Sequence, residues 1–247
     1  IADYIPIYVP YSKKYITIGH CLADLTGIDF KKGASSQKEA SKFSSLEEMV
    51  NSYAKKEIRA NTGSDFWYAD MHINIAARVI EVITKKKFEQ LITQKVLRPL
   101  AMKNTSFSPP SGGCANPASG AVSTANDFMN FLSMIMNKGV FNGKQILKEE
   151  TINTMFNVTY TPSMVTYTPK AAETFEYALG TWVLEKTIDN KPAVVGTTNF
   201  DGSWCIIDFC RNYAMVLFTK KELNDAKKDV FYKIKNAVDD QNPTYCK

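Results

Sequence analysis

The sequence predicts an α+β protein in which a mainly helical part is followed by an antiparallel sheet and a closing helix. Two observations carry this prediction. Apolar residues recur at helical spacing through the middle of the chain, most clearly from residue 70 to 87. After residue 177, β-rich runs follow one another with only turn residues between them, which is typical of antiparallel pairing. We therefore expect a helical lobe over residues 16–160, and strands with a C-terminal helix over residues 175–240.

Capping residues place the starts of several predicted helices. Ser45 can cap a helix that runs to about residue 57, with Glu48 as its capping-box partner. Asp70 can cap the next helix, and Thr124 can cap the one that follows the loop of residues 104–120. The predicted helices cover residues 19–25, 46–57, 70–87, 88–96, 125–137, 148–156 and 222–238. In the helix after Asp70, apolar residues recur at helical spacing, at Ile73, Ala76, Ala77, Ile80 and Ile83.

Four runs rich in β-branched and aromatic residues predict the strands. They cover residues 177–186, 193–196, 203–208 and 213–219, and turn residues separate them. The closing helix can pack on the resulting sheet through its apolar positions, which recur at helical spacing.

Composition narrows the possible functions. The chain has 247 residues, enough for one large domain or two lobes, with 45% apolar and 22% charged residues. The net charge of +5 is spread over scattered lysines without interleaved aromatic residues, so we expect no nucleic-acid binding. The apolar runs are too short to span a membrane. Two N-x-[ST] sequons, at Asn104 and Asn157, favour a secretory or extracellular location without fixing it.

The cysteine and histidine content argues against a metal site. Five cysteines make an odd count, and no pair has Cys-x-x-Cys spacing. Two histidines are too few for a histidine-rich metal cage. One or two disulfides could form in an oxidising compartment, and the spacing does not fix their pairing.

Six segments, taken in order, resemble those of the serine β-lactamase-related family, which includes class C β-lactamases, penicillin-binding DD-peptidases and esterases on that fold. The segments are ITIGHCLADLTGI at 16–28, YAD with its following helix at 68–84, VLRPLAMKNTSF at 96–107, GAVSTAND at 120–127, YALGTW at 177–182 and VGTTNFDG at 195–202. The resemblance covers nearly the whole chain. It implies a β-lactamase/transpeptidase-like fold, with an antiparallel sheet flanked by helices and a helical lobe.

The resemblance also implies a chemistry built on three motifs. A serine in Ser-x-x-Lys attacks an ester or amide carbonyl, and a tyrosine in Tyr-x-Asn or Tyr-x-Asp relays its proton. A Lys-Thr-Gly or His-Thr-Gly strand binds the substrate and supplies an oxyanion donor. This acyl-serine chemistry needs no metal and no organic cofactor.

The first motif is not found at the family's position. It precedes the segment matched by residues 1–10, so we expect a partial chain that lacks the N-terminal part of the fold. The matches at Ser35–Lys38 and Ser52–Lys55 fall after the family's position, and we interpret both as chance. The missing segment, or a partner chain, would then cover the apolar core that its absence exposes.

The second motif is present and the third is altered. Tyr68 and Asp70 fit the Tyr-x-Asp pattern, as a proton relay if the protein is active, or as a packed tyrosine beside a helix cap. At the third motif, Thr197 stands at the Lys or His position, Thr198 matches, and Asn199 replaces the glycine. A neutral hydroxyl cannot replace a cation, and a side chain in place of glycine should crowd the substrate.

Three functional hypotheses follow. The complete protein is a pseudoenzyme that uses its cleft for binding or assembly, or this is the C-terminal portion of a working serine hydrolase, or it is a structural subunit of a larger complex. The altered third motif favours the first hypothesis, and Tyr68 with Asp70 favours the second. The expected ligand is a small ester, amide or peptide, and we expect little or no β-lactamase activity because the basic residue is absent at Thr197.

Overall fold

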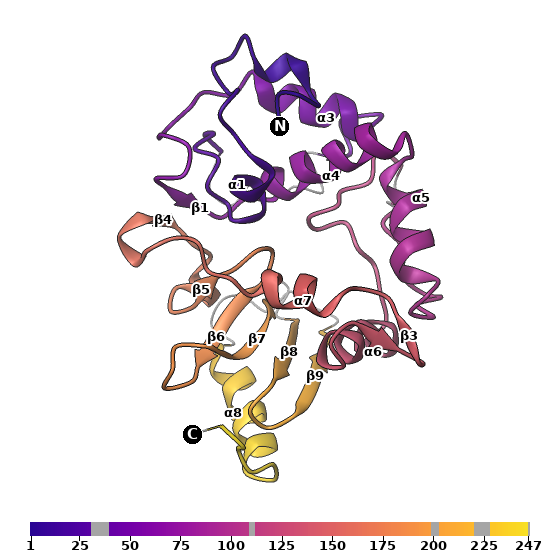
Figure 1. The fold of residues 1–247 in the computed structure, drawn as a ribbon, viewed down its shortest axis with the longest axis vertical. Helices are drawn as coiled ribbons and strands as arrows, with labels where there is room; N and C mark the ends of the chain where they lie inside the picture. Colours follow the sequence, from indigo (N-terminus) through magenta and orange to yellow (C-terminus); the bar gives the residue numbers. More distant parts are fainter. Residues whose placement is uncertain (31–39, 109–111, 199–202, 220–227, 247) are drawn as a thin grey trace. The chain divides into compact units, whose positions relative to one another are not determined.

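The computed structural model describes residues 1–247 except 31–39, 109–111, 199–202, 220–227 and 247 (Figure 1). The chain divides into two compact units. The first consists of Ile1–Arg98, Lys103–Ser123 and Thr159–Thr168, and the second of Pro99–Met102, Thr124–Val158 and Pro169–Lys247. Each unit is described by itself below.

The first unit is mainly helical. Its helices are α1 (Ile18–Leu22), α3 (Leu46–Ala54), α4 (Asp70–Thr84) and α5 (Phe88–Ile92), which continues as a π-helical turn over Thr93–Leu97. Two short strands, β1 (Phe66–Trp67) and β4 (Val165–Tyr167), pair in parallel. The core of this unit packs α3 and α4 against the N-terminal segment, where the buried Tyr8 hydroxyl donates a hydrogen bond to the carbonyl oxygen of Val50 at 2.9 Å.

The predicted caps of this unit are correct in part. Ser45 caps α3, because its hydroxyl accepts the backbone N–H of Glu48 at 3.1 Å. The Glu48 carboxylate, however, accepts from the backbone and hydroxyl of Ser44 rather than from Ser45, so the predicted capping box is wrong. Ala69, not Asp70, is the N-cap of α4, and Asp70 is the first helical residue.

The apolar positions of α4 are buried only in part. Ala76 and Ala77 are buried, but Ile80 and Ile83 are 47% and 56% exposed. The buried face runs instead through positions that include Ile75 and Val79, so it is rotated around the helix from the line of isoleucines. Ile80 and Ile83 therefore form an apolar face of α4 that the first unit itself does not cover.

The second unit is built on a five-stranded antiparallel sheet (Figure 1). The strands β5 (Glu176–Tyr177), β6 (Trp182–Lys186), β7 (Pro192–Thr198), β8 (Trp204–Asp208) and β9 (Tyr213–Leu217) lie in sequence order, each paired with the next. The predicted antiparallel order is thus confirmed. One predicted strand, over 177–186, is broken into β5 and β6 by a turn in which Gly180 has a φ of +89°, a conformation that glycine adopts without steric cost.

Helices complete the second unit. These are α6 (Ala125–Met136), α7 (Glu149–Met155) and α8 (Lys228–Asp239), and a small hairpin joins β2 (Val140–Phe141) to β3 (Lys144–Gln145). Thr124 caps α6 as predicted, accepting the N–H of Asp127 at 3.3 Å. In α8, the ring of Phe231 stacks on Trp204 of β8 with centroids 4.0 Å apart. The start predicted for this helix, residue 222, lies outside the described residues.

Two further features hold α8 and the C-terminal residues. Lys235, which is 1% exposed, pairs with Asp239 at 2.7 Å, Glu185 at 3.0 Å and Asp208 at 3.7 Å. A disulfide joins Cys210 to Cys246, which settles the pairing that the sequence left open. Across the described residues, no helix combines the length and apolar character that crossing a membrane requires.

Candidate functional site

The predicted site residues fall in different units of the chain. Tyr68 and Asp70 belong to the first unit, and residues 197 and 198 belong to the second. Asn199 lies outside the described residues.

The backbone around Tyr68 is held from both sides. The N–H of Trp67 donates to the carbonyl oxygen of Asp24, and the N–H of Tyr68 donates to the carbonyl oxygen of Tyr167, each at 3.1 Å. The N–H of Ala69 donates to the carboxylate of Asp24. Three consecutive amides are therefore fixed in an extended segment that leads directly into α4.

The surroundings of Tyr68 keep its phenol protonated. Burial raises the pKa of the Tyr68 phenol far above its usual value, and the carboxylates of Asp70 and Asp24 and the phenol of Tyr167 raise it further. An ionised tyrosine would need a nearby positive charge to offset this burial. The Tyr68 phenol is thus suited to donating a hydrogen bond rather than to acting as a base.

Asp70 lies in the first turn of the 15-residue helix α4. Acidic residues are favoured at this end of a helix, where the helix dipole is positive. Asp70 therefore adds a negative charge two residues from Tyr68, consistent with its effect on the pKa of that phenol.

A buried pair beneath this motif, Asp24 and His72, was missed by the sequence analysis. His72 lies in the first turn of α4, and its Nδ1 is hydrogen-bonded to Oδ1 of Asp24. Both side chains are 1% exposed. Burial raises the pKa of Asp24, while the contact with His72 opposes that shift. The two residues are 48 positions apart, so no local pattern connects them.

Trp67, the residue before Tyr68, is held by aromatic and charged neighbours. Its ring lies 5.2 Å from that of Tyr167, and the Arg59 guanidinium lies 4.0 Å from its centroid. Arg59 in turn pairs with Asp65, whose carboxylate also accepts the hydroxyl of Thr166. This cluster ties β1 to β4 and fixes the entry to the Tyr68 segment.

In the second unit, Thr197 lies within β7, a strand paired on both sides. Its register partner on β8 is Cys205, and the partner of Thr198 is Trp204. Thr197 is half-buried. In the residue before it, Gly196, the carbonyl oxygen accepts a hydrogen bond from the Thr181 hydroxyl at 2.9 Å. The position at which the resemblance expects a cation is thus a neutral hydroxyl on a strand that is paired with both of its neighbours.

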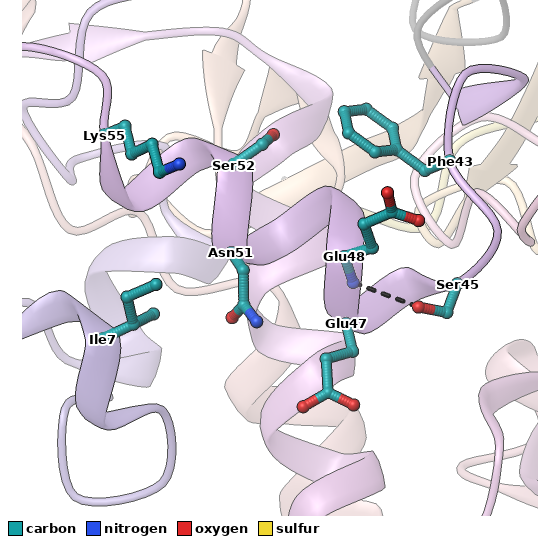
Figure 2. A pocket seen from close by; sticks show the side chains of 8 residues that line it. All are labelled: Ile7, Phe43, Ser45, Glu47, Glu48, Asn51, Ser52 and Lys55. Carbon is teal, nitrogen blue, oxygen red and sulfur yellow. Dashed lines mark hydrogen bonds between the residues drawn. The ribbon is translucent and has the colours of Figure 1, made fainter.

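A shallow pocket of about 470 Å³ lies along α3, and Ser52 and Lys55 are among its lining residues (Figure 2). The Ser52 hydroxyl donates to the carbonyl oxygen of Met49 at 2.6 Å, one turn back in the same helix. The carboxylate of Glu47 pairs with Arg78, and that of Glu48 is taken up by Ser44. Among the described residues, the Ser52–Lys55 match therefore shows no hydrogen bond that would activate the serine. Ser35–Lys38 lies outside the described residues.

No group of three or more His, Cys, Asp or Glu side chains is placed to hold a metal ion in the part of the chain that the structure describes.

Comparison with known proteins gives one family over nearly the whole chain. The family model for Beta-lactamase matches residues 1–238. Among curated proteins, the chain is 29% identical over 112 residues to Protein flp of Staphylococcus aureus (strain MW2). That match covers 42% of this chain and 22% of the Staphylococcus protein, so the chain matches only about a fifth of the length of this relative.

Solved structures share the fold at low sequence identity. A protein assigned as a β-lactamase from Bacteroides dorei DSM 17855 superposes with a TM-score of 0.77 at 20% identity, covering 96% of this chain and 76% of the other. EstCE1, described as a hydrolase with promiscuous acyltransferase activity, gives 0.70 at 16% identity over 96% and 76% of the two chains. The penicillin binding protein from Bacillus halodurans gives 0.69 at 13% identity over 91% and 74%. These likenesses establish the β-lactamase/transpeptidase-like fold.

Proposed function

Because this chain belongs to the β-lactamase family, we propose that it serves binding or assembly on a scaffold whose acyl-transfer chemistry is impaired. The observation that carries this proposal is Thr197 on β7, at the position where the family's third motif holds Lys or His.

The change at Thr197 removes a charge from the ligand's anchoring point. A Lys or His cation makes a charge-assisted hydrogen bond to a carboxylate, which is about twice as strong as a neutral one. The threonine hydroxyl offers a single neutral donor. We therefore propose a ligand without an anchoring carboxylate, in the class of small esters, amides or peptides, and little or no β-lactamase activity.

The state of Tyr68 supports impaired turnover. A proton relay works best when its pKa lies near the working pH. Burial and the carboxylates of Asp70 and Asp24 move the pKa of the Tyr68 phenol away from that range. Within this proposal Tyr68 acts as a hydrogen-bond donor to the ligand.

The exposed face of α4 points to an additional covering element. Ile80 and Ile83 present apolar side chains that the first unit leaves uncovered. The Bacteroides dorei protein has chain beyond the matched part, because this chain covers 76% of it. We propose that a further segment of that kind covers this face. Ile83→Lys should then destabilise the full-length protein by about 1–3 kcal/mol, whereas an exposed site would change by less than about 0.5 kcal/mol.

Active-site labelling tests the proposed loss of turnover. The full-length protein is incubated with a fluorescent fluorophosphonate and, separately, with a fluorescent penicillin, and nitrocefin hydrolysis is followed by absorbance. We expect no labelled serine and no nitrocefin turnover above buffer. Stoichiometric labelling with either probe, or steady nitrocefin turnover, would overturn the proposal.

A second candidate function is that of a working serine hydrolase whose nucleophile lies elsewhere in the full polypeptide. The fixed backbone of Tyr68 with Asp70 at the start of α4 favours it, because a relay residue must be held in place. In that case the fluorophosphonate labels one serine, and Tyr68→Phe abolishes the labelling without unfolding the protein. Labelling that persists in Tyr68→Phe would exclude this role for the tyrosine.

A further inference from the structure

We propose that the buried pair of Asp24 and His72 is the positioning device that fixes the chain on either side of Tyr68. The inference rests on the proposed role of Tyr68 as a donor to the ligand. Neither Asp24 nor His72 is assigned to the reacting centre, so both are positioning residues.

Asp24 contacts the Tyr68 segment at three points. Its carbonyl oxygen accepts the N–H of Trp67 at 3.1 Å, one residue before the tyrosine. Its carboxylate accepts the N–H of Ala69, one residue after it, and also meets Nδ1 of His72. Asp24 is thus hydrogen-bonded to the residues on both sides of Tyr68 and to the first turn of α4.

The backbone conformation of Asp24 makes these hydrogen bonds possible. Asp24 has a φ of +56°, in the left-handed region that few residues other than glycine, asparagine and aspartate adopt. In this conformation its main-chain oxygen accepts the N–H of Trp67 while its carboxylate accepts the N–H of Ala69. A side chain without acceptor oxygens at position 24 would keep at most the contact with Trp67.

His72 supplies the connection to α4. With Asp24 ionised, its carboxylate only accepts hydrogen bonds, and Nδ1 of His72 is then the donor of this contact. Its Nε2 is buried and has no hydrogen-bond partner among the described residues. His72 therefore uses its ring to tie the first turn of the helix to Asp24, and this fixes the direction in which the chain leaves Tyr68.

Energetics favour a role in geometry over one in stability. Both side chains are 1% exposed, so each loses its hydration on folding. In buried pairs this loss commonly offsets the attraction between the partners, and apolar replacements are often neutral or stabilising. A directional contact supplies what an apolar pair would lack, a fixed orientation of the segment that it joins.

Nuclear magnetic resonance of the full-length protein tests the proposal. Tyrosine labelled with carbon-13 at Cζ reports the setting of the Tyr68 phenol, with the resonance assigned through Tyr68→Phe. Amide hydrogen exchange at Trp67 and Ala69, compared with the rate expected from global unfolding, reports how stable the hydrogen bonds to Asp24 are. The variants are His72→Phe, which removes the donor, His72→Asn, which retains a donor near Nδ1, and Asp24→Asn, which weakens the acceptor.

A control variant separates positioning from general destabilisation. Ile75→Val trims a buried side chain in the same helix, and this apolar side chain cannot hydrogen-bond to Asp24. We expect His72→Phe to shift the Tyr68 resonance and to speed exchange at Trp67 and Ala69 by roughly tenfold relative to global unfolding. His72→Asn should restore both readouts, and Ile75→Val should lower stability while leaving both unchanged.

Three outcomes would overturn the proposal. These are an unshifted Tyr68 resonance in folded His72→Phe, equal shifts in His72→Phe and His72→Asn, or an equal shift in Ile75→Val. If His72→Phe does not fold, Asp24→Asn decides by the same readouts. Fluorophosphonate labelling of the wild-type protein would overturn the proposed function alone, because the resonances report geometry whether or not turnover occurs.

Discussion

Gly196 on β7 lies so close to the main chain of Cys205 on β8 that a Cβ at position 196 would stand 2.3 Å from the Cys205 carbonyl oxygen. The same Cβ would lie 2.8 Å from Cγ2 of Ile206. Both distances are shorter than normal van der Waals contacts, and one partner is backbone that cannot rotate away. The strand that carries Thr197 therefore depends on a glycine directly before it.

Gly196→Ala should destabilise the protein by about 1–3 kcal/mol, the usual cost of overpacking a filled core. The matched control is Gly19→Ala in α1, where the nearest non-neighbouring atom lies 3.6 Å from the added Cβ. That change should be neutral or stabilise the protein by up to about 1 kcal/mol, because alanine favours a helix. Urea unfolding measures both variants, and equal effects would contradict the close packing of β7 on β8.

Because the thiol of Cys21 is buried, the free energy of unfolding should fall as the pH rises in the alkaline range. Burial raises its pKa from 9.0 to about 12. Between these values the native state keeps a proton that the unfolded state releases, so its contribution to stability is complete below pH 9 and is lost as the pH rises toward 12. The loss should approach about 1.4 kcal/mol per pH unit.

Cys21→Ala removes this pH-dependent contribution while adding a cavity cost that does not change with pH. The difference in unfolding free energy between the wild-type protein and the variant should therefore narrow steadily above pH 9. Urea unfolding at a series of pH values from 8 upward gives that difference. A constant difference would show that the thiol does not titrate differently in the two states.

The charge network around Lys235 predicts an unequal effect of two lysines on one helix. Lys235 is 1% exposed and contacts Asp208, which is fully buried, whereas Lys233 is exposed. Lys235→Met should cost about 1–3 kcal/mol, because the buried Asp208 carboxylate loses one cationic partner while it keeps Arg211 at 3.2 Å. Lys233→Met should change stability by less than about 0.5 kcal/mol. Similar thermal midpoints for the two variants would argue against a buried network.

Local patterns in the sequence were enough for the α+β class and for most elements. Consecutive β-rich runs predicted the order of the sheet, since strands joined by short turns pair with their neighbours. The caps at Ser45 and Thr124 were also predictable, because a cap bonds within its own helix turn. The break between β5 and β6 was not, since Tyr177 to Lys186 reads as one β-rich run.

Features that depend on distant residues could not be predicted. The contact of Asp24 with His72 joins residues 48 positions apart, and the disulfide of Cys210 with Cys246 spans 36. The exposure of Ile80 on α4 could not be predicted either. Helical periodicity gives the spacing of apolar residues, but it does not show which face of the helix the tertiary structure covers. The sequence therefore named motif residues for the candidate site, and their roles stay predictions. It did not indicate the long-range contacts around Tyr68.

The central claim is that the protein lacks the cation that would bind a ligand carboxylate at position 197. Its most direct test is penicillin binding by the full-length protein with and without a cation at that position. Calorimetry with benzylpenicillin should detect no binding to the wild-type protein or to Ile188→Lys, which places the same charge on a side chain that is 89% exposed. Thr197→Lys should gain about tenfold to a hundredfold in affinity, the worth of one charge-assisted hydrogen bond. Tight binding by the wild-type protein, or no gain in Thr197→Lys, would contradict the claim that Thr197 decides which ligands the scaffold can hold.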